Sequence, residues 1–252
     1  LDALLARWPG QAFRNAPLSA YTTFRLGGPA DLLIVARSLE ELQEAVYLAE
    51  ESRLPWIVLG RGSNVMAADV GFRGVVIVNR AGGVRWELSG RTATLVVASG
   101  ESLAGLVRQT ARQGWAGLEW AAGIPGTVGG AVVGNAGAFG GCMASLVSWV
   151  DVCGGDGQVR RLETKELDFA YRHSRFRGRS CRETILEVGL LLHRGIADEL
   201  QRACAEHLRW RREHQPRGPS AGSVFRNPPG RAAGRLLDQA GMKGRACGAA
   251  WV

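Results

Sequence analysis

The first segment whose residue types could do chemistry is a short loop with two glycines. Gly60-Arg61-Gly62-Ser63-Asn64 follows residues 56–59, an apolar run that suits a buried strand. Because two positions lack a side chain, consecutive backbone N–H groups can converge on an oxyanion such as a phosphate. A tight turn between two strands explains the same residues equally well. The third glycine of a dinucleotide fingerprint is replaced by Val65, and residues 66–73 have no helical period, so a Rossmann fold is not predicted.

A second segment, residues 123–140, combines many glycines with an absence of charge. It contains Gly123-Ile124-Pro125-Gly126-Thr127-Val128-Gly129-Gly130-Ala131 and Asn135-Ala136-Gly137-Ala138-Phe139-Gly140. Turns alone seldom need so many small residues, so this segment is expected to bring backbone N–H and C=O groups close to a large planar ligand. The alternative is close packing of glycine-rich backbone against a sheet. A membrane span is not predicted, because glycine at this density makes a poor helix.

Two polar segments nearer the C-terminus suit anions and proton transfer. Tyr171-Arg172-His173-Ser174-Arg175-Phe176-Arg177 is basic and aromatic, and an arginine fork suits phosphate or carboxylate, although a solvated basic loop has the same composition. Residues 220–228 combine small polar residues with an Asn-Pro stop, and a hydroxyl on such a turn can donate a proton; an ordinary turn is the alternative. The histidines and cysteines lack metal-ligand spacing, so no metal site is predicted.

The composition is that of a globular protein with a basic surface. The 252 residues are 46% hydrophobic and 21% charged, which excludes a wholly disordered chain. The net charge of +8 favours anionic partners, namely phosphates, nucleotides, nucleic acid or acidic lipid. The five cysteines are odd in number and far apart, which favours a reducing compartment over a disulfide scaffold. Residues 1–25 contain no signal-peptide core, so a cytoplasmic location is expected.

A set of short predicted strands and helices must position these segments. Their order predicts an α+β protein with two mixed units and a smaller third region. The predicted strands cover residues 32–36, 56–59, 74–78, 84–88, 92–98, 146–153, 158–162 and 184–192. The predicted helices cover residues 38–49, 103–111, 200–208 and 232–240. The first helix is expected to open with a capping box between Ser38 and Glu41. The sequence ends in an apolar run, which predicts that further residues follow Val252.

Five blocks, taken in order, carry a resemblance to a known family. They are residues 18–30, 60–64, 117–140, 171–176 and 220–228, and together they span most of residues 15–245. In these blocks the sequence closely resembles UDP-N-acetylenolpyruvoylglucosamine reductase, a family of flavoenzymes of cell-wall precursor synthesis. The short stretch between Phe176 and Ser220 resembles the smaller subclass of the family, which lacks an inserted tyrosine-bearing loop.

This resemblance implies an α+β fold of the vanillyl-alcohol-oxidase type. Two FAD-binding units are expected at residues 1–80 and 81–194, and a substrate-binding domain, C-terminally incomplete, at residues 195–252. FAD would lie between the first two units without a covalent bond. The implied FAD contacts are Gly60, Arg61, Gly62, Ser63 and Asn64 at the diphosphate, and Gly123, Pro125, Gly126, Thr127, Gly130, Asn135 and Gly137 along the rest of the cofactor.

The implied reaction has two halves. NADPH reduces FAD, and the reduced flavin passes hydride to the enolpyruvyl double bond of UDP-N-acetylglucosamine enolpyruvate, which gives UDP-N-acetylmuramate. Hydride addition leaves an enolate-like charge that needs a fixed cation, and Arg172 matches the family's arginine for this role. Ser223 matches the family's proton donor, while Tyr171 and Asn227 are expected to orient the substrate. The family's catalytic glutamate near the C-terminus has no match, because no residue after Gly244 is acidic.

Two other functions stay open from the sequence. One is a different flavin oxidase of the same fold. The match of residues 220–228 to the substrate domain of the reductase family argues against it. The other is a nucleic-acid-binding module, suggested by the positive net charge. There are two basic clusters, residues 171–177 and a second one formed by Arg209, Arg211, Arg212 and Arg217 on and after a helix. They have few interleaved aromatic residues, namely Tyr171, Phe176 and Trp210. The expected partners are therefore the UDP-sugar substrate and NADPH, with no nucleic acid and no membrane.

Overall fold

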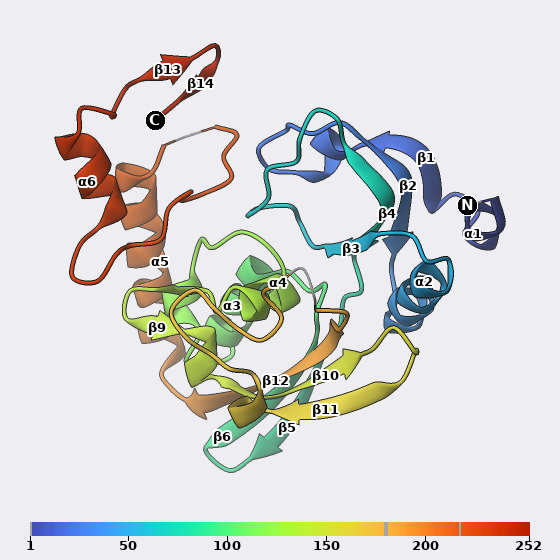
Figure 1. The fold of residues 1–252 in the computed structure, drawn as a ribbon. Coiled ribbons are helices and arrows are strands. Elements are labelled where there is room, and N and C mark those ends of the chain that lie inside the picture. Colours follow the sequence, from blue (N-terminus) through green and yellow to red (C-terminus); the bar gives the residue numbers. More distant parts are fainter. Residues whose placement is uncertain (1, 179–180, 217) are drawn as a thin grey trace.

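The computed structural model describes residues 2–178, 181–216 and 218–252, and its architecture is α+β. Figure 1 shows two units that each contain a sheet, followed by a helical C-terminal region that extends away from the second unit. The N-terminal and C-terminal ends lie on opposite sides of this view. The predicted order of two mixed units and a third region is therefore present in the chain.

The first unit is a four-stranded sheet with two helices, a short one and a longer one, packed on it. Its elements are α1 (Asp2–Arg7), β1 (Ala12–Pro17), the 3₁₀ helix η1 (Leu18–Tyr21), β2 (Pro29–Ala36), α2 (Leu39–Glu51), β3 (Trp56–Leu59) and β4 (Phe72–Asn79). The strand order is β1-β2-β4-β3, in which β2, β4 and β3 are parallel and β1 is antiparallel. The apolar face of α2 is buried on the sheet because Leu42, Val46 and Ala49 recur at helical spacing.

The start of α2 differs in one detail from the predicted capping box. The Ser38 hydroxyl accepts a hydrogen bond from the Glu41 backbone N–H at 3.2 Å, as expected. The Glu41 carboxylate, however, accepts the backbone N–H of Arg37 at 2.7 Å. It therefore binds a donor one residue before the helix cap, and the predicted pairing with the Ser38 N–H was wrong.

The second unit is built on a larger antiparallel sheet with the order β11-β10-β12-β6-β5, and β7 also pairs with β12. Its longer elements are β5 (Val84–Ser89), β6 (Thr92–Ala98), α3 (Leu103–Arg112), α4 (Val128–Val133), β10 (Val147–Cys153), β11 (Val159–Glu163) and β12 (Thr184–Arg194). Its short elements are β7 (Trp115–Ala116), η2 (Glu119–Ala121), β8 (Gly137–Ala138), β9 (Gly141–Cys142), η3 (Met143–Ser145) and η4 (Thr164–Glu166). The uncharged stretch of residues 120–150 is thus divided among several short elements.

The third region starts with a long helix that shares the core of the second unit. Its elements are α5 (Ala197–His214), α6 (Ala233–Gln239), β13 (Ala246–Cys247) and β14 (Ala250–Trp251). Cys204 of α5 is buried in the main apolar cluster, and Leu200 packs against that cluster. Among the described residues after Cys204, none is buried. By packing, the first half of α5 therefore belongs with the second unit.

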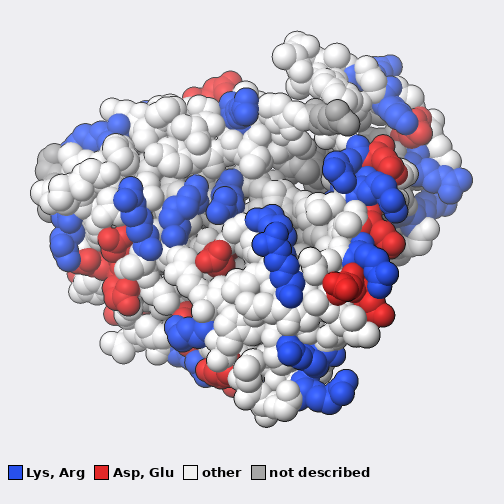
Figure 2. Space-filling model, turned by 180° about the vertical axis from the view of Figure 1, so that it is seen from behind, with Lys and Arg blue, Asp and Glu red and all other residues white. Residues whose placement is uncertain are grey.

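The surface carries the positive charge in a mixed pattern on the face shown in Figure 2. A band of basic side chains crosses this face, and acidic side chains lie beside it. In the part of the chain that the structure describes, no helix is long and apolar enough to cross a membrane.

Candidate functional site

The structure brings the two glycine-rich segments into direct contact, although about 60 residues separate them in the sequence. The Ser63 hydroxyl donates a hydrogen bond to the Pro125 carbonyl at 3.2 Å. A Cβ atom on Gly60 would lie 2.6 Å from Thr127 Oγ1, and one on Gly126 would lie 2.8 Å from Ser63 Oγ. Both distances are shorter than a van der Waals contact, so the two backbones approach each other because these positions lack side chains.

The 60–64 loop has its shape because Gly62 takes a positive φ of 62° directly after strand β3. A Cβ atom at Gly62 would lie 2.1 Å from the Tyr21 carbonyl oxygen. The Gly62 carbonyl in turn accepts the backbone N–H of Thr23 at 3.1 Å. The loop therefore needs glycine at position 62 in order to pack on the segment that follows η1. A glycine in this role also fits the alternative that residues 60–64 form a tight turn.

The Gly126–Gly130 part of the second segment forms the start of α4. Thr127 is the N-cap of this helix, and its hydroxyl accepts the Gly130 N–H at 3.2 Å. The Gly129 N–H donates to the Ser99 carbonyl at 2.8 Å, and a Cβ atom on Gly129 would lie 2.7 Å from Ser99 Cβ. The turn after β6 therefore fixes the position of the first turn of α4.

Asn79 and Arg80, two residues that the sequence analysis did not identify, connect the units at this point. The buried Asn79 amide donates to Ser99 Oγ at 2.8 Å and accepts the Ala81 N–H at 3.0 Å. The Arg80 guanidinium donates to the Gly60 carbonyl at 2.7 Å. The end of β4 therefore holds the 60–64 loop on one side and, through Ser99, the start of α4 on the other.

A cleft of about 620 Å³ lies between the two units beside these contacts. The first unit lines it with β3, β4 and Gly60, and the second unit lines it with Ser99, with residues of α4 and its N-cap Thr127, and with residues 181–185. This volume is within the range of roughly 300–1,000 Å³ that is usual for small-molecule sites. The cleft and the joined glycine segments together fit an extended cofactor that has an anionic part and a planar part.

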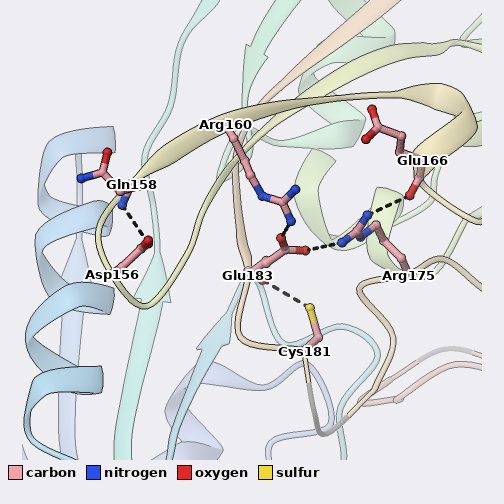
Figure 3. A network of polar contacts seen from close by, with 7 residues as sticks. All are labelled: Asp156, Gln158, Arg160, Glu166, Arg175, Cys181 and Glu183. Atoms are coloured by element: carbon pink, nitrogen blue, oxygen red, sulfur yellow. Dashed lines mark hydrogen bonds and ion pairs between the residues drawn. The ribbon is translucent and has the colours of Figure 1, made fainter.

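One wall of the cleft is held by the network of polar contacts in Figure 3. The Glu183 carboxylate lies between the guanidinium groups of Arg160 and Arg175 and forms an ion pair with each, at 3.1 Å for Arg175. Arg175 also donates to the Glu166 carbonyl at 3.1 Å. Glu183 lines the cleft, and Cys181 beside it contacts the Glu183 carbonyl. These pairs tie the segment before β12 to β11 and η4.

Arg172 lies in a tightly folded loop next to the end of α4. Its φ is 55°, a conformation that few residues other than glycine adopt. The Arg172 carbonyl accepts a hydrogen bond from Arg177 at 2.7 Å, and the guanidinium lies 5.7 Å from the Tyr171 ring centre. The buried Ser174 hydroxyl donates to the Val133 carbonyl at 2.8 Å. These contacts fix the loop that carries Arg172 to the last residue of α4.

A second cation, Arg211 of α5, lies close to Arg172. The sequence placed it in a basic cluster on and after a helix but gave it no role in the site. The Arg211 Nε donates to the Ala122 carbonyl at 2.9 Å, directly before Gly123. Burial and the nearby charge of Arg172 lower the pKa of Arg211. An arginine keeps its proton even so, which means that two positive charges converge here. An anion bound between them would relieve their repulsion.

The 220–228 loop reaches the same part of the molecule through Thr23. The Thr23 hydroxyl lies 2.8 Å from the Ser220 carbonyl and 3.3 Å from the Gly62 carbonyl, and it can donate to either. Ser223 lies three residues further along this loop with an exposed side chain. Thr23 thus contacts both the loop that carries the predicted proton donor, at Ser220, and the predicted diphosphate loop, at Gly62.

Several predicted site residues also have structural roles, which favour the packing alternative for those positions. The Asn135 amide donates to the Ala170 carbonyl at 2.9 Å and accepts the Ala144 N–H at 3.0 Å. Asn227 accepts the Ala233 N–H at the start of α6, at 2.9 Å. A Cβ atom built on Gly137 would lie 2.9 Å from the Gly141 carbonyl oxygen. One built on Gly123 would lie 2.8 Å from Arg211 Cδ. Contacts of these four residues with a ligand stay predictions.

Among the described residues, no group of three or more His, Cys, Asp or Glu side chains is arranged to hold a metal ion. The polar groups at this junction include arginine side chains, hydroxyls and backbone groups. Such groups bind anions and hydrogen-bonding rings.

Comparisons with known proteins identify the family of the chain. The FAD binding domain family matches residues 30–163, and the C-terminal domain of UDP-N-acetylenolpyruvoylglucosamine reductase matches residues 214–252. Relatives named UDP-N-acetylenolpyruvoylglucosamine reductase include one from Heliobacterium modesticaldum, 45% identical over 96% of this chain and 77% of its own length. Another, from Moorella thermoacetica, is 43% identical over 96% of this chain and 78% of its own length.

Solved structures give the same result for the fold. The chain is similar to UDP-N-acetylenolpyruvylglucosamine reductase from Thermus caldophilus, with a TM-score of 0.80 and 38% identity over 95% of this chain and 84% of that one. A solvent-stable cholesterol oxidase, with a TM-score of 0.56 and 18% identity over 73% of this chain and 37% of that one, shares the fold alone. The predicted FAD-binding α+β fold is confirmed, and the chain belongs to the UDP-N-acetylenolpyruvoylglucosamine reductase family.

Proposed function

We propose that this chain uses FAD and NADPH to reduce the enolpyruvyl group of UDP-N-acetylglucosamine enolpyruvate to UDP-N-acetylmuramate, in the cytoplasm, for peptidoglycan synthesis. The observation that carries the proposal is the junction of the two glycine-rich segments. Ser63 and Pro125 join them beside a cleft that lies between the two units, where the family places FAD. Residues 1–80 and 81–194 would form the FAD-binding units, and residues 195–252 would bind the substrate.

The residues present fit FAD as the group bound at this junction. The 60–64 loop offers backbone and the Arg61 side chain to the diphosphate, and residues 123–130, together with Asn135 and Gly137, would lie along the remainder of the cofactor. The missing side chains at Gly60 and Gly126 let the two segments approach each other closely, which places both beside the cleft. FAD, when bound, supplies the capacity to accept hydride from NADPH and to deliver it to the enolpyruvyl carbon.

Arg172 and Arg211 would hold the negative charge of the substrate. Hydride addition to the enolpyruvyl double bond places an enolate-like charge next to the substrate carboxylate, and a fixed cation stabilises that charge. Arg172 has a fixed backbone, and Arg211 is held by the Ala122 carbonyl. Because both charges are already close together in the free protein, they need little rearrangement to meet the substrate. Tyr171 would help to orient it.

Ser223 would donate the proton that completes the reaction. A serine hydroxyl is a poor acid on its own, so it must be placed at the carbon that receives the proton, and neighbouring groups must help it. The contact between Thr23 and the Ser220 carbonyl attaches its loop to the first unit. Asn227, which accepts the Ala233 N–H, would reach the substrate through its remaining amide group.

The reductase proposal is tested by following NADPH oxidation with the UDP-sugar under nitrogen. We expect NADPH to be consumed only when UDP-N-acetylglucosamine enolpyruvate is present. Mass spectrometry should show a product that is heavier by two hydrogens, in equal amount to the NADPH consumed. A protein that binds FAD but oxidises NADPH only with oxygen, whether or not the UDP-sugar is present, would instead be the flavin oxidase of the same fold.

A further inference from the structure

Arg80 follows strand β4 directly and lies against the first residue of the 60–64 loop. One of its guanidinium nitrogens, Nη1, donates hydrogen bonds to the Gly60 carbonyl at 2.7 Å and to the Asn79 carbonyl at 3.1 Å. Its own backbone N–H donates to the Ala36 carbonyl at 2.7 Å. The guanidinium is therefore fixed on one side to the sheet and on the other to the loop.

The charge of Arg80 is not neutralised by the protein. Burial, together with the positive charge of neighbouring Arg61, lowers the pKa of Arg80. No ion pair that the structure shows among its described residues includes Arg80 or Arg61. Since a guanidinium stays protonated at any ordinary pH, the loop has two unpaired positive charges beside it. Such a pair is unfavourable in the free protein and is relieved by an anion.

The anion that fits is a diphosphate, because the 60–64 loop carries Arg61, is bound by Arg80 at the Gly60 carbonyl, and lines the cleft at Gly60. We propose that Arg80 is a positioning residue of the diphosphate site. It anchors the loop through the Gly60 carbonyl and, with Arg61, supplies the positive charge that the two phosphate groups of FAD offset. This inference rests on the proposed function, and it adds a residue that lies outside all five blocks of the family resemblance.

Because Arg80 is adjacent to Asn79, the diphosphate site is also connected to the second glycine-rich segment. Asn79 is bound to Ser99, which accepts the Gly129 N–H at the first turn of α4. Adjacent residues at the end of β4 thus determine where both glycine-rich segments lie. Diphosphate binding at the loop would therefore also fix the relative position of the two walls of the cleft.

The test is to titrate FAD into the flavin-free chain for the parent, Arg80→Gln and Arg80→Lys at several NaCl concentrations. Arg91→Gln is the matched control, because Arg91 lies exposed in the turn between β5 and β6. We expect Arg80→Gln to weaken FAD binding by about tenfold to a hundredfold, the usual scale for a hydrogen bond to a charged group. Its affinity should also depend less on salt than that of the parent.

Arg80→Lys should stay within about threefold of the parent, because the charge is kept, and Arg91→Gln should match the parent. Parent-like FAD binding by Arg80→Gln would overturn the proposal. Weaker FAD binding by Arg80→Gln with an unchanged salt dependence would also overturn it, as would equal weakening of FAD binding by Arg80→Gln and Arg80→Lys. Either result would mean that Arg80 only supports the loop. A parent chain that binds no FAD at all would instead refute the proposed function.

Discussion

The contact between Gly60 and Thr127 allows a quantitative test of how the two glycine-rich segments meet. Gly60 has no positive φ, so alanine can adopt its backbone conformation. The added methyl group would lie 2.6 Å from Thr127 Oγ1 and 3.2 Å from Thr127 Cγ2, but 3.5 Å from Thr127 Cβ. Overpacking of this kind costs about 1–3 kcal/mol. If the 60–64 loop moves to relieve it, FAD affinity should fall by about five- to a hundredfold.

A double-mutant cycle separates this clash from other effects. Thr127→Ala removes both close atoms and leaves Cβ at an ordinary contact distance, but it also removes the N-cap of α4, which costs about 1 kcal/mol. Gly60→Ala in the Thr127→Ala background should therefore cost almost nothing. The double variant should unfold at nearly the same urea concentration as Thr127→Ala alone, and it should bind FAD with the same affinity.

The measurements are urea unfolding followed by circular dichroism and FAD titration followed by flavin fluorescence. Gly234→Ala is a control, because a Cβ atom at Gly234 would meet no atom within 4 Å. If the effects of Gly60→Ala and Thr127→Ala simply add, to within about 0.5 kcal/mol, the two residues are not coupled. The packing of the two segments described above would then be incorrect.

Three further predictions follow from the site and from the buried thiols. Arg172→Lys should leave NADPH-driven flavin reduction intact and strongly slow flavin reoxidation by the enolpyruvyl substrate in stopped-flow absorbance; equal slowing of both steps would mean that Arg172 supports the flavin instead. Ser223→Ala should lower turnover by about a hundredfold or more, with partial recovery in Ser223→Cys, whereas Ser220→Ala should cost little; the reverse pattern would assign the proton to Ser220. Burial raises the pKa of the Cys153 thiol to about 11, so at pH 8 a thiol reagent should label exposed Cys247 quickly and Cys153 only on unfolding; fast labelling of folded Cys153 would contradict its burial.

Most of the regular elements could be predicted because their apolar residues recur at a helical or strand period. In α3, for example, Leu103, Leu106, Val107 and Ala111 are all buried on one face, as their spacing indicates. Strand ends moved by up to three residues, as at the start of β2, since strand pairing does not stop at the apolar positions. The two-residue strands β7, β8, β9, β13 and β14 were not predicted, because segments so short have no period to detect.

The glycine-rich segments were also visible in the sequence, but their contact was not. The hydrogen bond from Ser63 to Pro125 depends on how two units pack, which no local pattern contains. Arg80 was missed, and Arg211 was noted only as a member of a basic cluster, because single arginines in an arginine-rich chain carry no spacing signal. Asn135 and Asn227 have residue types typical of ligand contacts, yet their side chains bind backbone groups of neighbouring segments. Only the three-dimensional arrangement distinguishes these uses.

The central claim, that this chain is a flavin-dependent reductase of the UDP-sugar, is tested most directly by one absorbance experiment under nitrogen. The FAD-loaded protein is mixed with NADPH and then with UDP-N-acetylglucosamine enolpyruvate. We expect the flavin band near 450 nm to disappear with NADPH and to return fully when the UDP-sugar is added. A protein that takes up no FAD, or a reduced flavin that stays colourless with the UDP-sugar but recovers its colour with oxygen, would contradict it.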